Sequence, residues 1–483
     1  MTDLPRTSLT GGLSIPRIVC GLWQVADIER KNGPMDSERG ADALQSYADK
    51  GLTAFDMADH YGTAELITGA LLRRYPTDER PFAFTKWCPE PGPMTADIVR
   101  AGVQDRLDRL GVKRVDLLQF HWWTFEHPAW LDALHEMKKL QTEGLIGAIG
   151  VTNFDASHLA LALADGIPVA SNQISFSVLD RRARGPLAAL CSASGVKLLA
   201  YGTLNGGFLS EKWLGAPEPE TISDWSKSKY KRFIDAAGGW VIYQELLAAL
   251  ADIGTRAGVS MANVATRWAL EQPAVAAVII GARLGENDHH ESNVRVFNFE
   301  LTRADHNALE VIFAKMTPIP GDCGDEYRKP PFLTASGDLS HHLSKIPSAY
   351  PATPTLHRVG LRVSSGSKWE PIAGYSRATR VKDTIYVSGT TATHTDGRSV
   401  APGDAAAQTT YILDKIAGAI SAAGGKIEDV VRTRVYLRDA SACDAVSLAH
   451  GRVFGQVMPA NTLIVAGGLI GDYEVEIEAD AVT

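Results

Sequence analysis

The sequence has no long hydrophobic run. Its first residues, MTDLPRTSLTGGLSIPRI, lack the apolar core of a signal peptide, and no later segment approaches the roughly 20 apolar residues that a membrane span needs. Only five cysteines occur in 483 residues, and no two of them form a CxxC pair. We therefore expect neither a disulfide framework nor a structural zinc site, and no other metal. We expect a soluble protein of the cytoplasm.

An excess of positive charge is also absent. The formal net charge is −8, so there is no electrostatic reason to expect nucleic acid as a partner, and we expect no membrane partner either. The composition, 45% hydrophobic and 22% charged, is ordinary for a globular protein. Because 483 residues are too many for one compact core, two or more domains are expected.

What the sequence does contain is a recurring unit of a short apolar run followed by an amphipathic stretch. Most of the runs are too short for helices, whereas stretches such as MTADIVRAGVQDRLDRLG have helical spacing. Eight such units in about 300 residues predict an α/β fold, a (β/α)8 TIM barrel. A doubly wound open sheet is the alternative, but no GxGxxG turn follows the first run. The runs are IVCGLWQ (18–24), LTAFDMA (52–58), FAFTKW (82–87), VDLLQFHW (115–122), IGAIGVTN (146–153), VASNQISF (169–176), VKLLAYGT (196–203) and VAAVIIGA (275–282).

The repeating pattern stops near residue 318. A segment rich in Pro, Ser and Gly follows, and regular periods then return in TRVKDTIYVSG, DAAAQTTYILDKIAGAISAAGG and EVEIEADAV. Strands that alternate around a long helix predict a smaller α+β domain. The boundaries that we expect are a barrel over 1–335, a tail and linker over 336–364, and a second domain over 365–483.

Polar residues end several of the apolar runs. Asp56 ends the second run and Tyr61 follows it, Lys86 ends the third run, and His121 ends the fourth. In a barrel these strand ends meet at one mouth. The lysine would need Asp56 as a counter-charge, its ammonium would lower the pKa of the tyrosine, and the histidine could direct a substrate oxygen. The set suits protonation of a carbonyl oxygen while another group attacks the carbon.

These residues carry a resemblance to a known family. FDMADHYGTAE resembles the Asp-x-Ala-x-x-Tyr-Gly-x-x-Glu signature of the aldo-keto reductases, and FTKW, LLQFHW, GVTNF and NQISFSVLDR follow in that family's order. The resemblance covers about residues 8–335. It implies a catalytic tetrad of Asp56, Tyr61, Lys86 and His121, with Tyr61 as the general acid and base. It also implies a nicotinamide cofactor lying across the mouth.

The same resemblance assigns cofactor-binding residues. It implies carboxamide ligands at Thr152, Asn153 and Gln173, and a nicotinamide-stacking ring at Tyr201. A pyrophosphate loop and a closing adenosine-phosphate segment are implied at Gly202, Gly206, Gly207, Leu209 and Ser210, and at Gly281, Arg283, Asn287 and Asn293, respectively. Arg283 is the expected partner of a 2′-phosphate, so the expected cofactor is NADP(H), with NAD(H) not excluded.

Tryptophans flank the same strand ends. Trp23, Trp87 and Trp122 either line an aromatic substrate pocket or pack inside the barrel, and the sequence leaves both readings open.

The second domain carries its own resemblance. AGYSRATRVKDTIYVSG, AAQTTYILDKIAGAISAAGG, DVVRTRVYLRD and YEVEIEADAV resemble the Rid (YjgF) family of imine/enamine deaminases, over about residues 365–483. The resemblance implies a homotrimer with a ligand cleft at each subunit interface, to which Tyr375, Ser388 and Glu476 contribute, and Glu476 could orient a water.

One position departs from that family. Its deaminases carry an arginine in a Pro-Ala-Arg run, and here the run is MPANTL, which places Asn461 there. A neutral amide cannot replace the bidentate, charged contact of arginine with a carboxylate, and the loss costs roughly 2–5 kcal/mol in a desolvated cleft. We therefore do not expect deamination of 2-imino acids. The domain would bind a neutral imine or enamine, or serve only in assembly.

Two functions from different classes follow. The leading hypothesis is an NAD(P)H-dependent oxidoreductase that reduces a small-molecule aldehyde or ketone, or oxidises the alcohol, with a C-terminal domain for assembly or for imine/enamine hydrolysis. The alternative is a nucleotide-sensing or scaffold protein with a non-catalytic trimerising domain.

Overall fold

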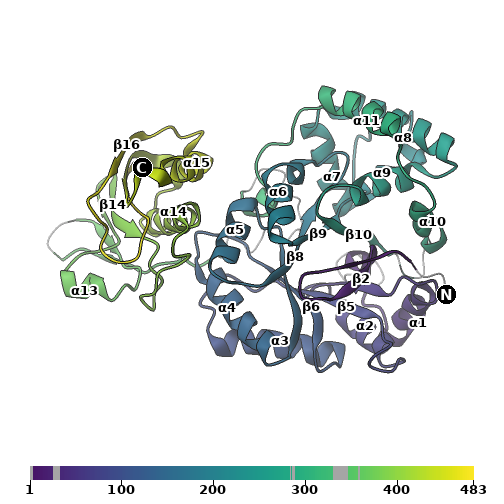
Figure 1. Ribbon diagram of the computed structural model, residues 1–483, viewed down its shortest axis with the longest axis horizontal. Coiled ribbons are helices and arrows are strands. Elements are labelled where there is room, and N and C mark those ends of the chain that lie inside the picture. Colours follow the sequence, from purple (N-terminus) through teal and green to yellow (C-terminus); the bar gives the residue numbers. More distant parts are fainter. Residues whose placement is uncertain (1–3, 26–32, 283, 285–288, 330–345, 357–358) are drawn as a thin grey trace.

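The computed structural model describes residues 4–25, 33–282, 284, 289–329, 346–356 and 359–483. Two bodies stand side by side, a large barrel built from the N-terminal part of the chain and a smaller domain that ends at the C-terminus (Figure 1). None of the helices in these ranges combines the length and the apolar character that crossing a membrane requires.

Eight parallel strands close the barrel, in the order β10-β3-β4-β5-β6-β7-β8-β9. The ring closes because β10 pairs with both β9 and β3. Each predicted apolar run forms one of the strands, so the predicted (β/α)8 fold is confirmed. The strands are β3 (Ile18–Gly21), β4 (Ala54–Asp56), β5 (Phe82–Trp87), β6 (Val115–His121), β7 (Ile146–Thr152), β8 (Val169–Ser175), β9 (Lys197–Tyr201) and β10 (Val275–Gly281).

A short antiparallel hairpin precedes the barrel and was not predicted. Its strands are β1 (Arg6–Ser8) and β2 (Ser14–Pro16). Leu9 and Ile15 from the hairpin belong to the same buried cluster as the inward-facing Val19, Phe84 and Leu117 of the barrel strands. The hairpin therefore caps the end of the barrel where the strands begin, and the opposite end carries the polar strand termini.

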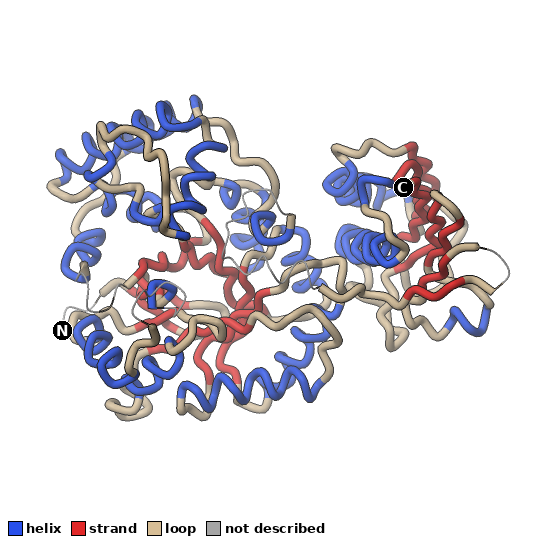
Figure 2. The backbone as a smooth tube through the Cα atoms, turned by 180° about the vertical axis from the view of Figure 1, so that it is seen from behind, coloured by secondary structure: helices blue, strands red, loops and turns tan. Residues whose placement is uncertain are grey.

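Helices surround the strands, as the tube view shows (Figure 2). The predicted signals hold at α3, where Thr95 accepts from the backbone N–H of Ile98 and Gly111 ends the helix at φ 65°. The helices of the barrel domain are α1 (Ser37–Ala48), α2 (Ala64–Leu72), α3 (Ala96–Leu110), α4 (Ala129–Thr142), α5 (Ala156–Ala164), α6 (Pro186–Ser194), α7 (Trp225–Ala236), α8 (Gly239–Ala257), α9 (Met261–Leu270), α10 (His290–Val294), α11 (Arg303–Lys315) and α12 (Asp325–Arg328).

The second domain is a seven-stranded mixed sheet with its two long helices on one face, in the order β11-β12-β13-β14-β17-β15-β16. β11 and β12 lie in the segment expected to be linker, where three-residue strands are too short to show an alternating pattern. The strands are β11 (Ala352–Pro354), β12 (Leu361–Val363), β13 (Ala378–Val381), β14 (Thr384–Thr391), β15 (Val430–Leu437), β16 (Ala460–Val465) and β17 (Val475–Val482), and the helices are α13 (Trp369–Ala373), α14 (Ala405–Ala422) and α15 (Cys443–Phe454).

The helical face of this domain is turned toward the barrel. Both backbone views show α14 and α15 between the sheet and the barrel, while the other face of the sheet points away from it (Figures 1 and 2). α14 packs against α5. The approach is close at Gly418, where an added Cβ would lie 2.5 Å from the carbonyl oxygen of Glu126.

Charged side chains cross the domain border at two separate places along α5. Near the start of α5, the imidazole of His158 lies 3.1 Å from a carboxylate oxygen of Asp414. At its end, Asp165 accepts a hydrogen bond of 2.9 Å from Arg398 and also lies 2.7 Å from the ring of His135. Such pairs stabilise a docked arrangement only where both partners are well held, as they are here by burial.

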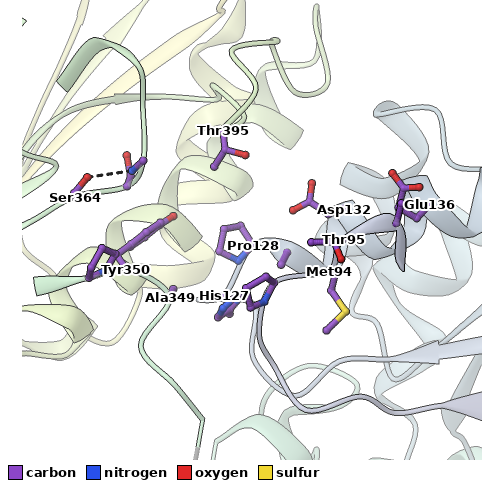
Figure 3. Close-up of a pocket in the computed structure, with 16 residues that line it drawn as sticks. Met94, Thr95, His127, Pro128, Asp132, Glu136, Ala349, Tyr350, Ser364 and Thr395 are labelled. Carbon is purple, nitrogen blue, oxygen red and sulfur yellow. Dashed lines mark hydrogen bonds between the residues drawn. The ribbon is translucent and has the colours of Figure 1, made fainter. Parts of the chain in front are cut away.

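A cavity of about 450 Å³ opens at the same border, bounded by the first turns of α3 and α4 and by the C-terminal domain (Figure 3). Met94, Thr95 and Asp132 line it from the barrel side, and Tyr350 and Ser364 line it from the other side. None of the four residues of the expected catalytic tetrad lines this cavity.

The ion pair at Asp165 predicts a pH-dependent stability. Burial alone would raise the pKa of this carboxyl, but hydrogen bonds from His135, Arg398 and the backbone N–H of Ala401 lower it to about 2. A lowered pKa means that the stabilisation is present above the unfolded value of about 4 and is lost as the pH falls toward 2. Denaturant unfolding should show wild type more stable than Asp165→Asn by roughly 1–2 kcal/mol at pH 7. The difference should vanish near pH 2, and a difference that does not change with pH would contradict this assignment.

Candidate active site

A buried ion pair stands at the mouth of the barrel. β4 ends at Asp56 and β5 carries Lys86 near its end, so adjacent parallel strands bring the two together. The ammonium of Lys86 donates to Oδ2 of Asp56 over 2.5 Å, and the side chains are 5% and 4% exposed, respectively. Neither charge could be buried alone at an acceptable cost in free energy, so each one requires the other.

Two glutamines hold the other oxygen of the same carboxylate. The side-chain amides of Gln119, on β6, and Gln173, on β8, donate to Oδ1 of Asp56 over 2.8 and 2.7 Å, and Gln173 also donates to Gln119 over 2.7 Å. Asp56 therefore accepts from three donors, which leaves it little freedom to turn away from Lys86. Sequence reasoning missed Gln119, although its polar side chain inside the apolar run VDLLQFHW was a signal.

Tyr61 lies over the ion pair. The Nζ atom of Lys86 is 5.1 Å from the centre of the Tyr61 ring. Edge-to-face contacts with Trp23 and His60, at 5.0 and 4.8 Å between ring centres, hold that ring in the loop after β4. The structure thus brings together Asp56, Tyr61 and Lys86 from two strands and one loop.

His121, the last residue of β6, completes the group at the mouth. Its ring is buried, and neither ring nitrogen has a hydrogen-bond partner among the described residues. Burial, followed by the nearby charges of Arg328, His60 and Lys86, lowers the pKa of His121 well below its usual value. The imidazole is therefore neutral near pH 7, with one nitrogen able to donate to a ligand.

The expected carboxamide ligands also meet at this mouth. Thr152 ends β7 and is paired in register with Gln173 on β8. Asn153 follows with a left-handed φ of 58°, and its side-chain oxygen accepts a hydrogen bond of 2.8 Å from the hydroxyl of Tyr201. Burial raises the pKa of Tyr201 well above its usual value, so this phenol keeps its proton and is suited to packing rather than to acid–base work.

Unpartnered polar atoms show that this mouth fits a polar ligand. The hydroxyl of Thr152 and both ring nitrogens of His121 are buried with no partner in the described part of the chain. Native proteins rarely leave such atoms unsatisfied. A nicotinamide carboxamide, with donors and acceptors on one flat group, and a carbonyl substrate would satisfy them, so the donor set fits the expected cofactor.

Packing and backbone conformation also require glycine at positions of the expected pyrophosphate loop. Gly202, Gly206 and Gly207 all adopt left-handed φ values, of 70°, 63° and 89°. A Cβ on Gly202 would lie 2.6 Å from the hydroxyl oxygen of Tyr230, and one on Gly206 would lie 2.9 Å from its ring, because α7 packs on the loop. No described residue approaches within 4 Å of the corresponding position on Gly207, so this backbone is open toward the described part of the chain.

The remaining residues of the loop are less clearly placed for a ligand. Leu209 is fully buried, so its side chain belongs to the core. Ser210 donates its hydroxyl to the carbonyl of Gly207 over 2.9 Å. Asn205, which sequence reasoning did not single out, has a buried side-chain amide without a partner among the described residues.

Part of the expected adenosine-phosphate segment can be located. Gly281 is the last residue of β10, and Asn293 lies on α10. Arg283 and Asn287 lie outside the described residues.

The three tryptophans separate into two groups. Trp23 is half-buried and touches Tyr61, so it lines the mouth. Trp87 packs against α3, where a Cβ on Gly102 would lie 2.5 Å from its ring. Trp122 is fully buried and donates to the carbonyl of His127 over 3.0 Å. Of the two readings that the sequence left open, the burial of Trp87 and Trp122 favours packing, and Trp23 remains a candidate for the pocket.

Asp59, His60 and Cys88 form a group whose ligand atoms lie within 4.8 Å of one another. A bound cation is disfavoured there by two features. Arg106 is 3.8 Å from Asp59, and burial, followed by the charge of Asp59, raises the pKa of the Cys88 thiol well above its usual value. We assign no metal to this group.

Three residues from α7 and α12 reach the mouth and were missed. Lys229, on α7, donates to the hydroxyl of Tyr327, on α12, and the ring centre of Tyr327 lies 5.4 Å from that of His121. Arg328, also on α12, donates to the backbone carbonyls of Trp122 and Asn153. The sequence around α12 is rich in Gly and Pro and has no helical period, so it contained no signal for their position.

In the second domain, a buried arginine contacts two of the residues expected to line the cleft. The guanidinium of Arg377 donates to the carbonyl oxygens of Ser388 and Gly389 over 3.2 and 2.7 Å, and to the hydroxyl of Tyr375 over 3.2 Å. Glu476 lies against Gly389, where an added Cβ would be 2.1 Å from its carboxylate. Burial, followed by the charge of Glu478, raises the pKa of Glu476.

Asn461 is not part of this group within one chain. Glu476 pairs with Tyr436, and Tyr436 pairs with Ile464 on β16. Asn461 is three residues from Ile464 along that strand and is exposed. The structure therefore brings together Tyr375, Ser388 and Glu476 but leaves Asn461 at a different level of the sheet, two strands away.

The fold and this mouth define an α/β-barrel protein of the oxidoreductase class. Comparison with known families agrees with it. The sequence model of the aldo/keto reductase family matches residues 17–313, and the chain belongs to that family. The sequence model described as endoribonuclease L-PSP, which covers the Rid/YjgF proteins, matches residues 366–483, so both domains occur in one chain.

Individual relatives each match only part of this chain. The flagellar radial spoke protein 5 of Chlamydomonas reinhardtii is 33% identical over 177 residues, which is 32% of this chain and only a third of that protein. Protein tas of Escherichia coli is 27% identical over 59% of this chain and 93% of its own length. An uncharacterized protein of Streptomyces coelicolor is 40% identical over 24% of this chain and 90% of its own length.

Solved structures agree on the fold of the barrel. The glycerol dehydrogenase of Gluconobacter oxydans aligns with a TM-score of 0.56 at 23% identity, over 66% of this chain and 97% of that chain.

Proposed function

We propose that the barrel is a nicotinamide-dependent reductase of an aldehyde or ketone, also able to catalyse the reverse oxidation of the alcohol. The observation that carries the proposal is the buried pair of Lys86 and Asp56 beside the ring of Tyr61. It places a fixed positive charge next to a phenol at the mouth of a barrel, which is what transfer of a proton to a carbonyl oxygen requires.

Each residue has a defined part in this proposal. Tyr61 gives its hydroxyl proton to the carbonyl oxygen, and the ammonium of Lys86 stabilises the phenolate that remains. Asp56 keeps Lys86 in place. Neutral His121 donates a hydrogen bond to the same oxygen and so fixes its direction. When bound, the nicotinamide cofactor supplies the hydride to the carbonyl carbon. In the reverse direction the Tyr61 phenolate accepts the proton.

The residues that would hold the cofactor are those with unsatisfied or left-handed groups at the mouth. Thr152 and Asn153 would orient the carboxamide, and the ring of Tyr201 would support the nicotinamide face. The open backbone at Gly207 would face the pyrophosphate. We propose NADP(H) over NAD(H) on the basis of Arg283 alone, and affinities for the two nucleotides, compared in wild type and Arg283→Gln, decide between them.

Tyr61→Phe removes the proposed proton donor without changing the size of the ring. We expect carbonyl reduction to fall roughly 10²–10⁴-fold in kcat, because that is the usual contribution of a positioned general acid. The affinity for NADPH, measured by quenching of tryptophan fluorescence, should stay close to that of wild type. A wild-type protein that binds the nucleotide but reduces none of a broad panel of carbonyls would instead favour the nucleotide-sensing function. Retention of turnover by Tyr61→Phe would contradict the proposed role of the phenol.

For the C-terminal domain we propose assembly into a homotrimer. The face of the sheet opposite α14 and α15 points away from the barrel (Figure 1). It exposes apolar side chains next to charged ones, with Tyr386 at 52% and Ile464 at 48% exposure. Asn461 in place of arginine favours assembly over deamination, since it offers no charge to a carboxylate.

The trimer can be tested by the mass of the full chain in solution. Light scattering or sedimentation of the wild type should give about three times the 52.0 kDa of one chain. Ile464→Glu should shift the population toward the monomer, because it places a charge in the apolar part of the proposed contact. Leu448→Glu, a change at an exposed leucine of α15 on the helical side, is the control and should leave the mass unchanged. A monomeric wild type would overturn the proposal.

A further inference from the structure

One aromatic ring at the domain border contacts both an imidazole and a guanidinium. The ring of Phe125 stacks on His158 with 3.4 Å between centres and 9° between planes. The guanidinium carbon of Arg328 lies 4.2 Å from the centre of the same ring. Both distances are too short for an approach along the ring edge, so Phe125 is held between the imidazole and the guanidinium.

On the inner side, Arg328 holds the ends of two barrel strands. One terminal nitrogen donates to the carbonyl of Asn153 over 2.6 Å, and the other donates to the carbonyl of Trp122 over 3.0 Å. These carbonyls belong to the residues that directly follow Thr152 and His121. A planar guanidinium fixes the relative position of two acceptors in a way that a lysine ammonium cannot.

The backbone segments around this contact are closely packed. An added Cβ on Gly324 would lie 2.3 Å from the carbonyl oxygen of Asn153. Asn153 is also held by its left-handed backbone and by the hydrogen bond from Tyr201. A small displacement of Arg328 would therefore displace the backbone of Asn153 as well.

Phe125 supports the guanidinium from the side opposite the barrel strands, in addition to the two carbonyls. Among the described residues, no carboxylate lies within ion-pair distance of Arg328, and its Nε atom is buried without a partner. The charge is therefore stabilised by two carbonyls and by the face of Phe125, a contact that strengthens when it is desolvated. The position of Arg328 thus depends on the position of that ring.

On the outer side, the C-terminal domain holds the histidine that supports the ring. Nδ1 of His158 lies 2.5 Å from Asp155, the N-cap of α5, and Nε2 lies 3.1 Å from Asp414 on α14. Asp155 also receives Arg452 of the C-terminal domain at 3.4 Å. With both ring nitrogens engaged, His158 cannot rotate without breaking a contact across the border.

We propose that Arg328 is a positioning residue for the cofactor-binding strand ends, and that Asp414 of the C-terminal domain holds it in place through His158 and Phe125. The inference rests on the proposed function for its meaning, since Asn153 is a proposed ligand of the cofactor. It assigns the C-terminal domain a part in the barrel's chemistry beyond assembly.

The test compares two conservative variants of the full chain. Asp414→Asn removes the charge from the contact that leads to Arg328, whereas Asp165→Asn removes the charge from another contact with the C-terminal domain, at the far end of α5. We expect Asp414→Asn to speed backbone hydrogen exchange at residues 152–154 about fivefold without cofactor, and to raise the Kd for NADPH about fivefold. Asp165→Asn should change neither by more than about twofold. Equal effects of the two variants, or no effect of Asp414→Asn, would overturn the inference.

Arg328 variants separate positioning from general destabilisation. Arg328→Met should raise the Kd for NADPH and speed the same exchange, and Arg328→Lys, which keeps the charge but loses the planar fork, should restore only part of both. Adding Asp414→Asn to Arg328→Met should change little further, and fully multiplicative effects would contradict the chain of contacts. If wild type binds no nicotinamide nucleotide, the proposed function fails, and hydrogen exchange without cofactor still decides this inference.

Discussion

The ion pair between Lys86 and Asp56 is the constraint on which the site depends. The ammonium of Lys86 lies at the end of a barrel strand with almost no access to solvent, so it requires a counter-charge, which Asp56 supplies. The need to hold this pair in place determines which side chains surround it. Two glutamines from β6 and β8 hold the carboxylate, so four of the eight strands contribute to one small polar cluster. The consequence is a rigid positive charge that faces a phenol, rather than a flexible lysine at the surface. Rigid placement of charge where it will be needed is the largest contribution that a protein scaffold makes to many reactions.

The fold could be predicted from the sequence because the runs that form β3–β10 are short, apolar and regularly spaced. That Asp56, Lys86 and His121 meet at one mouth could be predicted for a related reason, since the end of a parallel strand determines which mouth a residue faces. The role of Gln119 was harder to predict, because one polar residue inside an apolar run has many explanations. Trp87 and Trp122 could not be placed, since an aromatic residue at a strand end packs equally well inward or toward a ligand, and here α3 and the loop that carries His127 bury them.

Other features depend on contacts between distant parts of the chain. Tyr327 and Arg328 reach the mouth from a segment without a periodic pattern, because α12 packs on strand ends more than 170 residues earlier, and Lys229 reaches it from α7, which packs on the loop after β9. β11 and β12 were hidden in a Pro- and Ser-rich stretch because they are three residues long and pair only at the edge of an existing sheet. The docking of the two domains also has no local signature, since His158, Asp414, Asp165 and Arg398 are ordinary charged residues of the sequence.

The central claim is that the ammonium of Lys86 makes the phenol of Tyr61 a usable acid and base. The most direct test is the pH dependence of kcat/KM for alcohol oxidation, in which the ionised phenol is the active form. Wild type is compared with the charge-balanced double variant Asp56→Asn with Lys86→Met, which leaves no unpaired buried charge. The account predicts that the rise of kcat/KM with pH moves to higher pH by at least about one unit in the double variant. A profile that stays at the wild-type position would contradict it.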